Sequence, residues 1–182
     1  MNKIIAFVKE ELSFDHSGHN FSHIERVVKN AEMLIKHEGG NSKIIITACY
    51  LHDIIDTKLF TDIEKQKEKI VNVLVNASYF PAEIEEILEI IESVSFSKGN
   101  INDVDNLNLE IVRDADRLDA LGAIGIIRTI EYGASKKREF YTEENLSRSL
   151  DEVKFNELST ASACFKLKFN KTFCGKTFFV FV

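Results

Sequence analysis

The stretch LHDIID, residues 51–56, places a histidine and two aspartates at the end of an otherwise apolar segment, KIIITACYLHDIID. A buried carboxylate without a partner costs several kcal/mol, so His52, Asp53 and Asp56 raise the question of what stabilises them there. On a continuous helix, Asp56 would share a face with both His52 and Asp53. An equally open alternative is a helix end at which the two aspartates emerge into water.

A second stretch, HSGHNFSHIERV at residues 16–27, contributes His19 and His23, which are four residues apart. Gly18 and Asn20 place His19 in a loop, whereas His23 falls at the expected start of a helix. Taken alone, both histidines fit surface or capping positions as well as a binding site.

A third stretch, EIVRDADRLDALGAIGIIRT at residues 110–129, contributes acids in a strongly apolar context. Asp116 and Asp119 lie three residues apart and would share a helical face. Pairing with Arg113 and Arg117 is an equally open explanation for these acids.

Together, the three stretches offer imidazole nitrogens and carboxylate oxygens, which are ligands for Zn²⁺, Mn²⁺, Fe²⁺ or Mg²⁺. A divalent cation would supply the positive charge that makes buried acids tolerable. The residue types therefore predict a metal site.

The elements that must position these residues are predicted to be helices. Helical periodicity occurs at residues 4–12, 22–38, 42–55, 62–77, 81–94, 107–120, 122–133 and 142–158. No alternation of period two that demands a sheet occurs before residue 160. We predict an all-α, single-domain bundle of roughly six to eight helices over residues 1–160.

Composition excludes several classes of function. The chain has 182 residues and a net charge of −6, without a dense Lys/Arg stripe, which disfavours nucleic-acid binding. No apolar run approaches the roughly 20 residues of a membrane span, and the start of the chain does not resemble a signal peptide. The three cysteines show no metal-ligand spacing, which fits a reducing cytoplasm.

Residues 161–182, ASACFKLKFNKTFCGKTFFVFV, differ from the rest of the chain. They contain six of the fourteen phenylalanines, four lysines and no acid. Aromatic alternation there favours a strand or a poorly packed tail over a helix. We predict that this atypical tail is not a separate domain and contributes no ligand.

With these motifs in order, residues 1–158 resemble the HD-domain metal-dependent phosphohydrolases, close to a subgroup of small bacterial HD hydrolases. The signature of that family is His…His-Asp…Asp, spread over separate helices of an all-α fold. The matching segments are GHNFSHIERV at 18–27, ACYLHDIIDTK at 48–58, SVSFSKG at 93–99 and VRDADRLDALGAIGIIRT at 112–129. The tail departs from the helical segment with which this subgroup usually continues.

The resemblance implies a role for each polar residue. Four positions match the ligands of one divalent ion, which could be Mn²⁺, Mg²⁺, Co²⁺, Fe²⁺ or Zn²⁺: His23, His52, Asp53 and Asp116. Asp56 matches a catalytic acid/base. Three positions flank the site where a phosphate could be held: His19, Arg26 and Lys58. Asp114 and Asp119 match positions that could orient the ligands.

The implied activity is hydrolysis of a phosphorylated small molecule, most simply a nucleotide. Within the subgroup we expect a nucleoside triphosphate, perhaps a deoxy one, to be cut to its monophosphate and pyrophosphate. A 5′-nucleotidase and a nucleotide-binding module without turnover stay open as alternatives, as does a homodimer.

Overall fold

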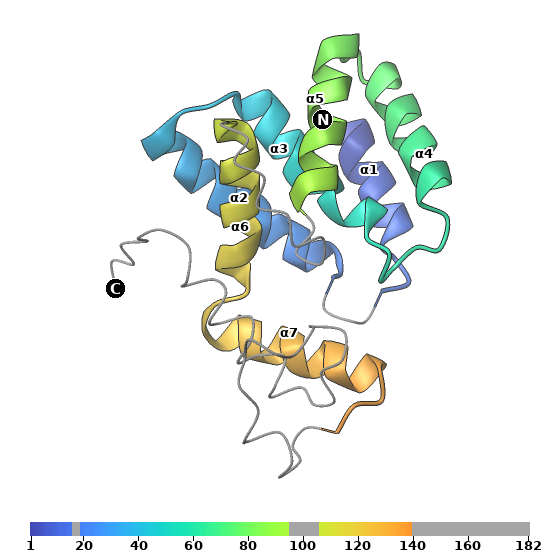
Figure 1. The fold of residues 1–182 in the computed structure, drawn as a ribbon, viewed down its shortest axis with the longest axis vertical. Coiled ribbons are helices and arrows are strands. Elements are labelled where there is room, and N and C mark those ends of the chain that lie inside the picture. Colours follow the sequence, from blue (N-terminus) through green and yellow to red (C-terminus); the bar gives the residue numbers. More distant parts are fainter. Residues whose placement is uncertain (16–18, 95–105, 140–182) are drawn as a thin grey trace. The chain divides into compact units, whose positions relative to one another are not determined.

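The computed structural model describes residues 1–15, 19–94 and 106–139 (Figure 1). Its elements, in chain order, are α1 (Asn2–Glu11), α2 (Phe21–Glu38), α3 (Ser42–Leu51), the 3-10 helix η1 (His52–Ile55), α4 (Ile63–Asn76), α5 (Pro81–Val94), α6 (Leu107–Asp119) and α7 (Gly122–Ser135). The predicted all-α fold is confirmed. The helix expected at 142–158, the tail at 161–182 and most of the SVSFSKG motif lie outside the described residues.

The described residues belong to two compact units. The first comprises residues 1–15 and 19–118, and the second includes Asp119 and α7. The two units are treated separately below. Among the described helices, none combines the length and the hydrophobicity that a membrane span requires.

Helix α3 is the centre of the first unit. It packs against α1, α2 and α5, and its sequence SKIIITACYL is apolar around most of its circumference. Its side chains from Ile44 to Leu51 are largely buried, together with the inward faces of its neighbours. The chain therefore builds its core around the helix that leads directly into His52.

Two glycines separate α2 from α3. Gly39 and Gly40 have φ values of 86° and 91°, in the range that favours glycine. Space is also restricted at Gly40, where an added Cβ would lie 2.8 Å from Ile45 Cδ1 and 3.0 Å from Asn108 Oδ1. This tight connection sets α2 beside α3, so that His23 and His52 can approach each other.

The prediction of one continuous helix over residues 42–55 was wrong. The α-helix ends at Leu51, the chain tightens into η1, and Asp56 leaves it in an extended conformation with φ −77° and ψ 123°. The imidazole of His52 is hydrogen-bonded to the Cys49 carbonyl, three residues earlier, where the tighter helix begins. Asp56 consequently does not share a helical face with His52 and Asp53.

Candidate metal centre

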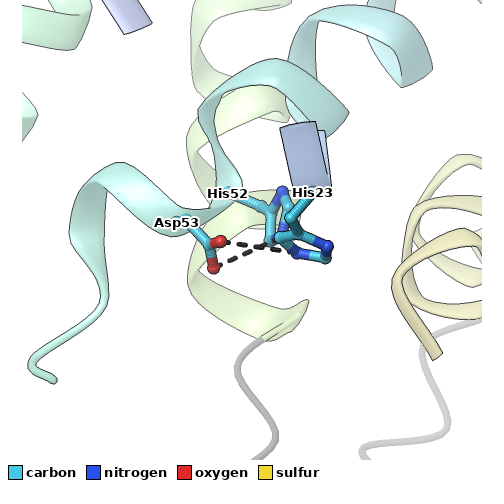
Figure 2. Close-up of side chains that lie close together, drawn as sticks. All are labelled: His23, His52 and Asp53. Atoms are coloured by element: carbon cyan, nitrogen blue, oxygen red, sulfur yellow. Dashed lines mark ion pairs between the residues drawn. The ribbon is translucent and has the colours of Figure 1, made fainter. Parts of the chain in front are cut away.

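Three side chains from two segments meet inside the first unit (Figure 2). His23 comes from the first turn of α2, whereas His52 and Asp53 come from η1. All three are buried, with 0%, 7% and 5% of their surfaces exposed, respectively. They form a group in which one ligand atom from each residue lies within 4.8 Å of the others.

The distances place carboxylate oxygens directly opposite imidazole nitrogens. His23 Nε2 lies 3.5 Å from Asp53 Oδ2, and His52 Nε2 lies 3.3 Å from Asp53 Oδ1. Asp116 of α6 joins them, with its Oδ1 3.3 Å from His23 Nε2 and 3.8 Å from His52 Nε2. The structure thus brings together the four residues that the sequence analysis assigned as metal ligands.

The helix cap at Asn20 fixes the position of His23. The Asn20 side-chain oxygen accepts the backbone N–H groups of Ser22, at 3.2 Å, and of His23, at 3.4 Å. This is the usual way in which asparagine satisfies the unpaired donors of a helix start. The sequence analysis used Asn20 only as a sign of a loop, although an asparagine just before an amphipathic segment is also a capping signal.

His52 is held in one tautomer. Its Nδ1 lies 2.8 Å from the Cys49 carbonyl oxygen, and because a carbonyl can only accept, Nδ1 must carry the proton. In the neutral ring, Nε2 then presents its lone pair to the two carboxylates. Within the described part of the chain, His52 Nε2 and Asp53 Oδ2 are buried and have no hydrogen-bond partner.

This donor set fits a divalent cation. A lone pair that faces carboxylate oxygens is repulsive unless a positive charge lies between them, and an ion could accept electron pairs from all four side chains. The hydrogen bond from His52 Nδ1 to a backbone carbonyl is the outer contact that commonly orients a metal-binding histidine.

The local charges favour ionised Asp53. Burial disfavours its charged form, but the positive charge that His52, His19 and His23 carry when protonated outweighs both burial and the repulsion from Asp116. The pKa of Asp53 therefore lies below its ordinary value. The carboxylate is available as an anionic ligand.

Asp56 and Lys58 lie just beyond η1. Asp56 Oδ1 accepts the Lys58 backbone N–H at 2.8 Å, and Lys58 Nζ lies 3.6 Å from Asp56 Oδ2. Both side chains are partly buried. A carboxylate and an ammonium group are thus held together three to five residues after Asp53.

The other two flanking residues lie near the start of α2. The rings of His19 and His23 pack edge to face with centroids 6.3 Å apart, and the His19 backbone N–H donates to Asp15 Oδ2 at 3.0 Å. Arg26 is one helical turn beyond His23 and extends its Nη1 to Ser22 Oγ, 3.5 Å away.

The two additional acids of α6 have arginine partners. Asp114 Oδ1 lies 4.0 Å from Arg117 Nη1, and burial raises the pKa of Asp114 to about 6. Asp119, in the second unit, makes a buried 3.0 Å ion pair with Arg128 of α7. Arg117 is one of the two arginines that the sequence analysis named as possible partners of these acids, whereas the pairing of Asp119 with Arg128 was not predicted.

Asn30 is a further residue that the sequence analysis missed. Its side-chain amide donates to the Ala115 carbonyl at 3.1 Å and links α2 to α6 next to Asp116. The available signal was its position seven residues after His23, which places a polar side chain on the same face of α2.

Comparisons with known proteins agree with this geometry. The family model of the HD domain matches residues 20–121, which include all four clustered residues. YpgQ of Bacillus subtilis (strain 168) is 31% identical over 144 residues, which are 78% of this chain and 70% of YpgQ.

Several solved structures have similar folds. A Lactobacillus plantarum protein superposes with a TM-score of 0.81 at 31% identity, covering 94% of this chain and 81% of that one. An HD-superfamily hydrolase from Bacillus thuringiensis superposes with a TM-score of 0.62 at 32% identity, covering 94% of this chain and 88% of that one. The structure of YpgQ in complex with ADP superposes with a TM-score of 0.66 at 27% identity, covering 93% of each chain.

Proposed function

Because this chain belongs to the HD-domain family, we propose that it is a divalent-metal-dependent phosphohydrolase acting on nucleotides. Membership rests on the family model, which spans more than half of the chain, and it confirms the resemblance deduced from the sequence motifs. The observation that carries the proposal is the convergence of four oppositely facing donor side chains, His23, His52, Asp53 and Asp116, of which the first three are buried.

A nucleotide is the favoured substrate class for two reasons. YpgQ, a relative with the same fold, has been crystallised with ADP. In addition, this acidic chain has cationic groups, His19, Arg26 and Lys58, on the segments that flank the cluster. We propose cleavage of a nucleoside or deoxynucleoside triphosphate to the monophosphate and pyrophosphate, in the cytoplasm where such substrates occur.

The four clustered side chains would hold the ion. When bound, a divalent ion would lower the pKa of a water molecule towards neutral pH and would stabilise negative charge on the phosphoryl oxygens. Asp56, already hydrogen-bonded and close to Lys58, is suited to move a proton to or from the attacking water or the leaving oxygen. Lys58, Arg26 and His19 in its protonated form would offset the negative charge that develops during phosphoryl transfer.

The test is a substrate screen that separates pyrophosphate from phosphate. Purified protein is incubated with nucleoside and deoxynucleoside tri-, di- and monophosphates in the presence of Mn²⁺, Mg²⁺ or Co²⁺. Release of pyrophosphate from triphosphates, abolished by a chelator and restored by metal, is the expected result.

Other outcomes of the screen distinguish the alternatives. Release of phosphate from monophosphates only would identify a 5′-nucleotidase. Metal-dependent nucleotide binding without any product would identify a binding module. A chain that binds no divalent ion would overturn the metal centre itself.

A further inference from the structure

An aromatic pair joins the loop that follows α1 to the loop that follows η1. Phe14 follows α1 and Phe60 follows η1, and their ring centroids lie 5.7 Å apart at an interplanar angle of 89°. Phe14 is 55% exposed, whereas Phe60 is partly buried. Such an edge-to-face contact leaves ring surface of the exposed partner available for another contact.

Both loops also carry residues of the proposed site. Phe14 directly precedes Asp15, whose carboxylate accepts the backbone N–H of His19. On the other loop, the backbone N–H of Phe60 donates to the Asp56 carbonyl at 3.0 Å. Phe60 is therefore hydrogen-bonded to the residue proposed to transfer protons, and Phe14 directly precedes the residue that binds the His19 backbone.

The neighbouring aromatic pair is already engaged. Phe21 stacks on Tyr50 with centroids 6.4 Å apart and rings inclined by 19°, and the ammonium group of Lys9 lies 4.7 Å from the Phe21 ring centroid. Both side chains of that pair are partly buried. Phe14 is thus the more accessible aromatic surface on the segments that flank the cluster.

We propose that Phe14, supported from the side by Phe60, is the platform on which the base of the nucleotide stacks. This inference rests on the nucleotide substrate proposed above, whose phosphates would lie at the metal centre. Stacking on phenylalanine uses the π-face that every base possesses, and it does not read the hydrogen-bonding edge. The platform therefore favours nucleotides over other phosphates while discriminating weakly among bases.

The experiment compares two ligands that differ only in the base. Binding of ADP and of ribose 5-diphosphate is measured by calorimetry in the presence of Mn²⁺, for the unmodified protein and for Phe14→Ala. We expect the substitution to weaken ADP binding by about 5- to 150-fold, from the usual contribution of one stacked base. Binding of ribose 5-diphosphate should be unchanged, and Phe14→Trp should restore ADP binding.

Phe80 provides a matched control. It is 71% exposed and precedes α5, outside the two loops that carry the aromatic pair. Phe80→Ala removes an equally large exposed ring and should leave the binding of both ligands unchanged.

Three results would overturn the platform: equal weakening of both ligands, no effect of Phe14→Ala, or the absence of ADP binding by the unmodified protein. Equal weakening would show that the pair merely holds the loops in place. Because binding is measured without turnover, a protein that binds ADP through Phe14 but hydrolyses nothing would refute the proposed activity and leave the platform standing.

Discussion

At the scale of single residues, His52 uses its two ring nitrogens for different tasks. Nδ1 is committed to the Cys49 carbonyl, so Nε2 is the atom that faces the carboxylates. The side chain thereby links the end of the central helix to the candidate ion. Removing the His52 side chain should affect metal binding more than folding. The Cys49 carbonyl can accept a hydrogen bond from another donor, whereas the ion would lose one of its ligands.

We predict that His52→Ala loses bound metal. Equilibrium dialysis with Mn²⁺, followed by elemental analysis, should detect a decrease in affinity of at least the 10- to 100-fold seen when even outer contacts of a metal site are removed. His37→Ala is the control, since His37 is exposed near the end of α2. Equal metal content in both variants would remove His52 from the ligand set.

Asp56 is predicted to serve turnover and not metal binding. Asp56→Asn preserves the shape of the side chain and its oxygen acceptor for the Lys58 N–H, but it cannot accept a proton as a carboxylate does. We expect metal affinity to persist and the turnover number to fall by about 10²- to 10⁴-fold. Unchanged turnover of the best substrate would reassign Asp56 to the structure of the loop.

At the scale of elements, the site depends on how α2, η1 and α6 are joined. Asn30 connects α2 to α6 through the Ala115 carbonyl, one residue before Asp116. The glycine pair between α2 and α3 sets a second connection. These contacts bring the proposed ligands from three segments close to one another.

Asn30→Ala should therefore weaken both the fold and the metal site. Loss of the donor removes one partly buried hydrogen bond between the two helices, which contributes about 0.5–1.5 kcal/mol to the unfolding free energy. Metal affinity should fall as well, because Asp116 follows the released carbonyl. Chemical denaturation and metal titration measure the two effects. Lys29→Ala, at an exposed neighbouring position, should change neither.

The glycine pair offers a graded test of the connection. At Gly39, alanine meets only the unfavourable backbone conformation, which costs about 1–3 kcal/mol. At Gly40, alanine also collides with Ile45 and Asn108, so its cost should be larger. Thermal unfolding of Gly39→Ala and Gly40→Ala should therefore rank them in that order; a reversed order would show that α2 and α3 adjust freely.

Local periodicity predicted the helices well but could not predict their ends at the site. Pro81 and Gly39 mark helix boundaries in the sequence, whereas the change at Leu51 has no such signal. It accompanies a side-chain hydrogen bond made by His52, which hydrophobic periodicity does not encode. Likewise, the approach of His23 to Asp116 joins residues distant in sequence, and only the family resemblance suggested it.

At the scale of the whole molecule, the proposed ligands are confined to the first compact unit. His23, His52, Asp53 and Asp116 all lie within residues 19–118. The atypical segment 161–182 therefore supplies none of them, whatever its own conformation. The second unit contributes a buried ion pair between Asp119 and Arg128, which does not include any proposed ligand.

We predict that deletion of residues 161–182 leaves metal affinity within a few-fold and improves solubility. The deleted segment is rich in phenylalanine and has no acid, a composition that favours association between chains. Metal titration and light scattering of the full and shortened chains provide the comparison. As a control, replacing Phe178, Phe179 and Phe181 by serine should improve solubility in the same direction. Failure of the shortened chain to fold would show that the phenylalanines fill a core.

The boundary of the first unit at Leu118 also has a consequence for biosynthesis. Translation proceeds from the N-terminus at about 5–20 residues per second, so the residues from 119 to 182 are added over roughly 3–13 s after the last ligand has been joined to the chain. All four proposed ligands therefore leave the ribosome before residues 119–182 do. If the proposed ligands hold an ion, its capture could begin on the nascent chain, and an alteration of the reading frame beyond residue 118 would leave these ligands unchanged.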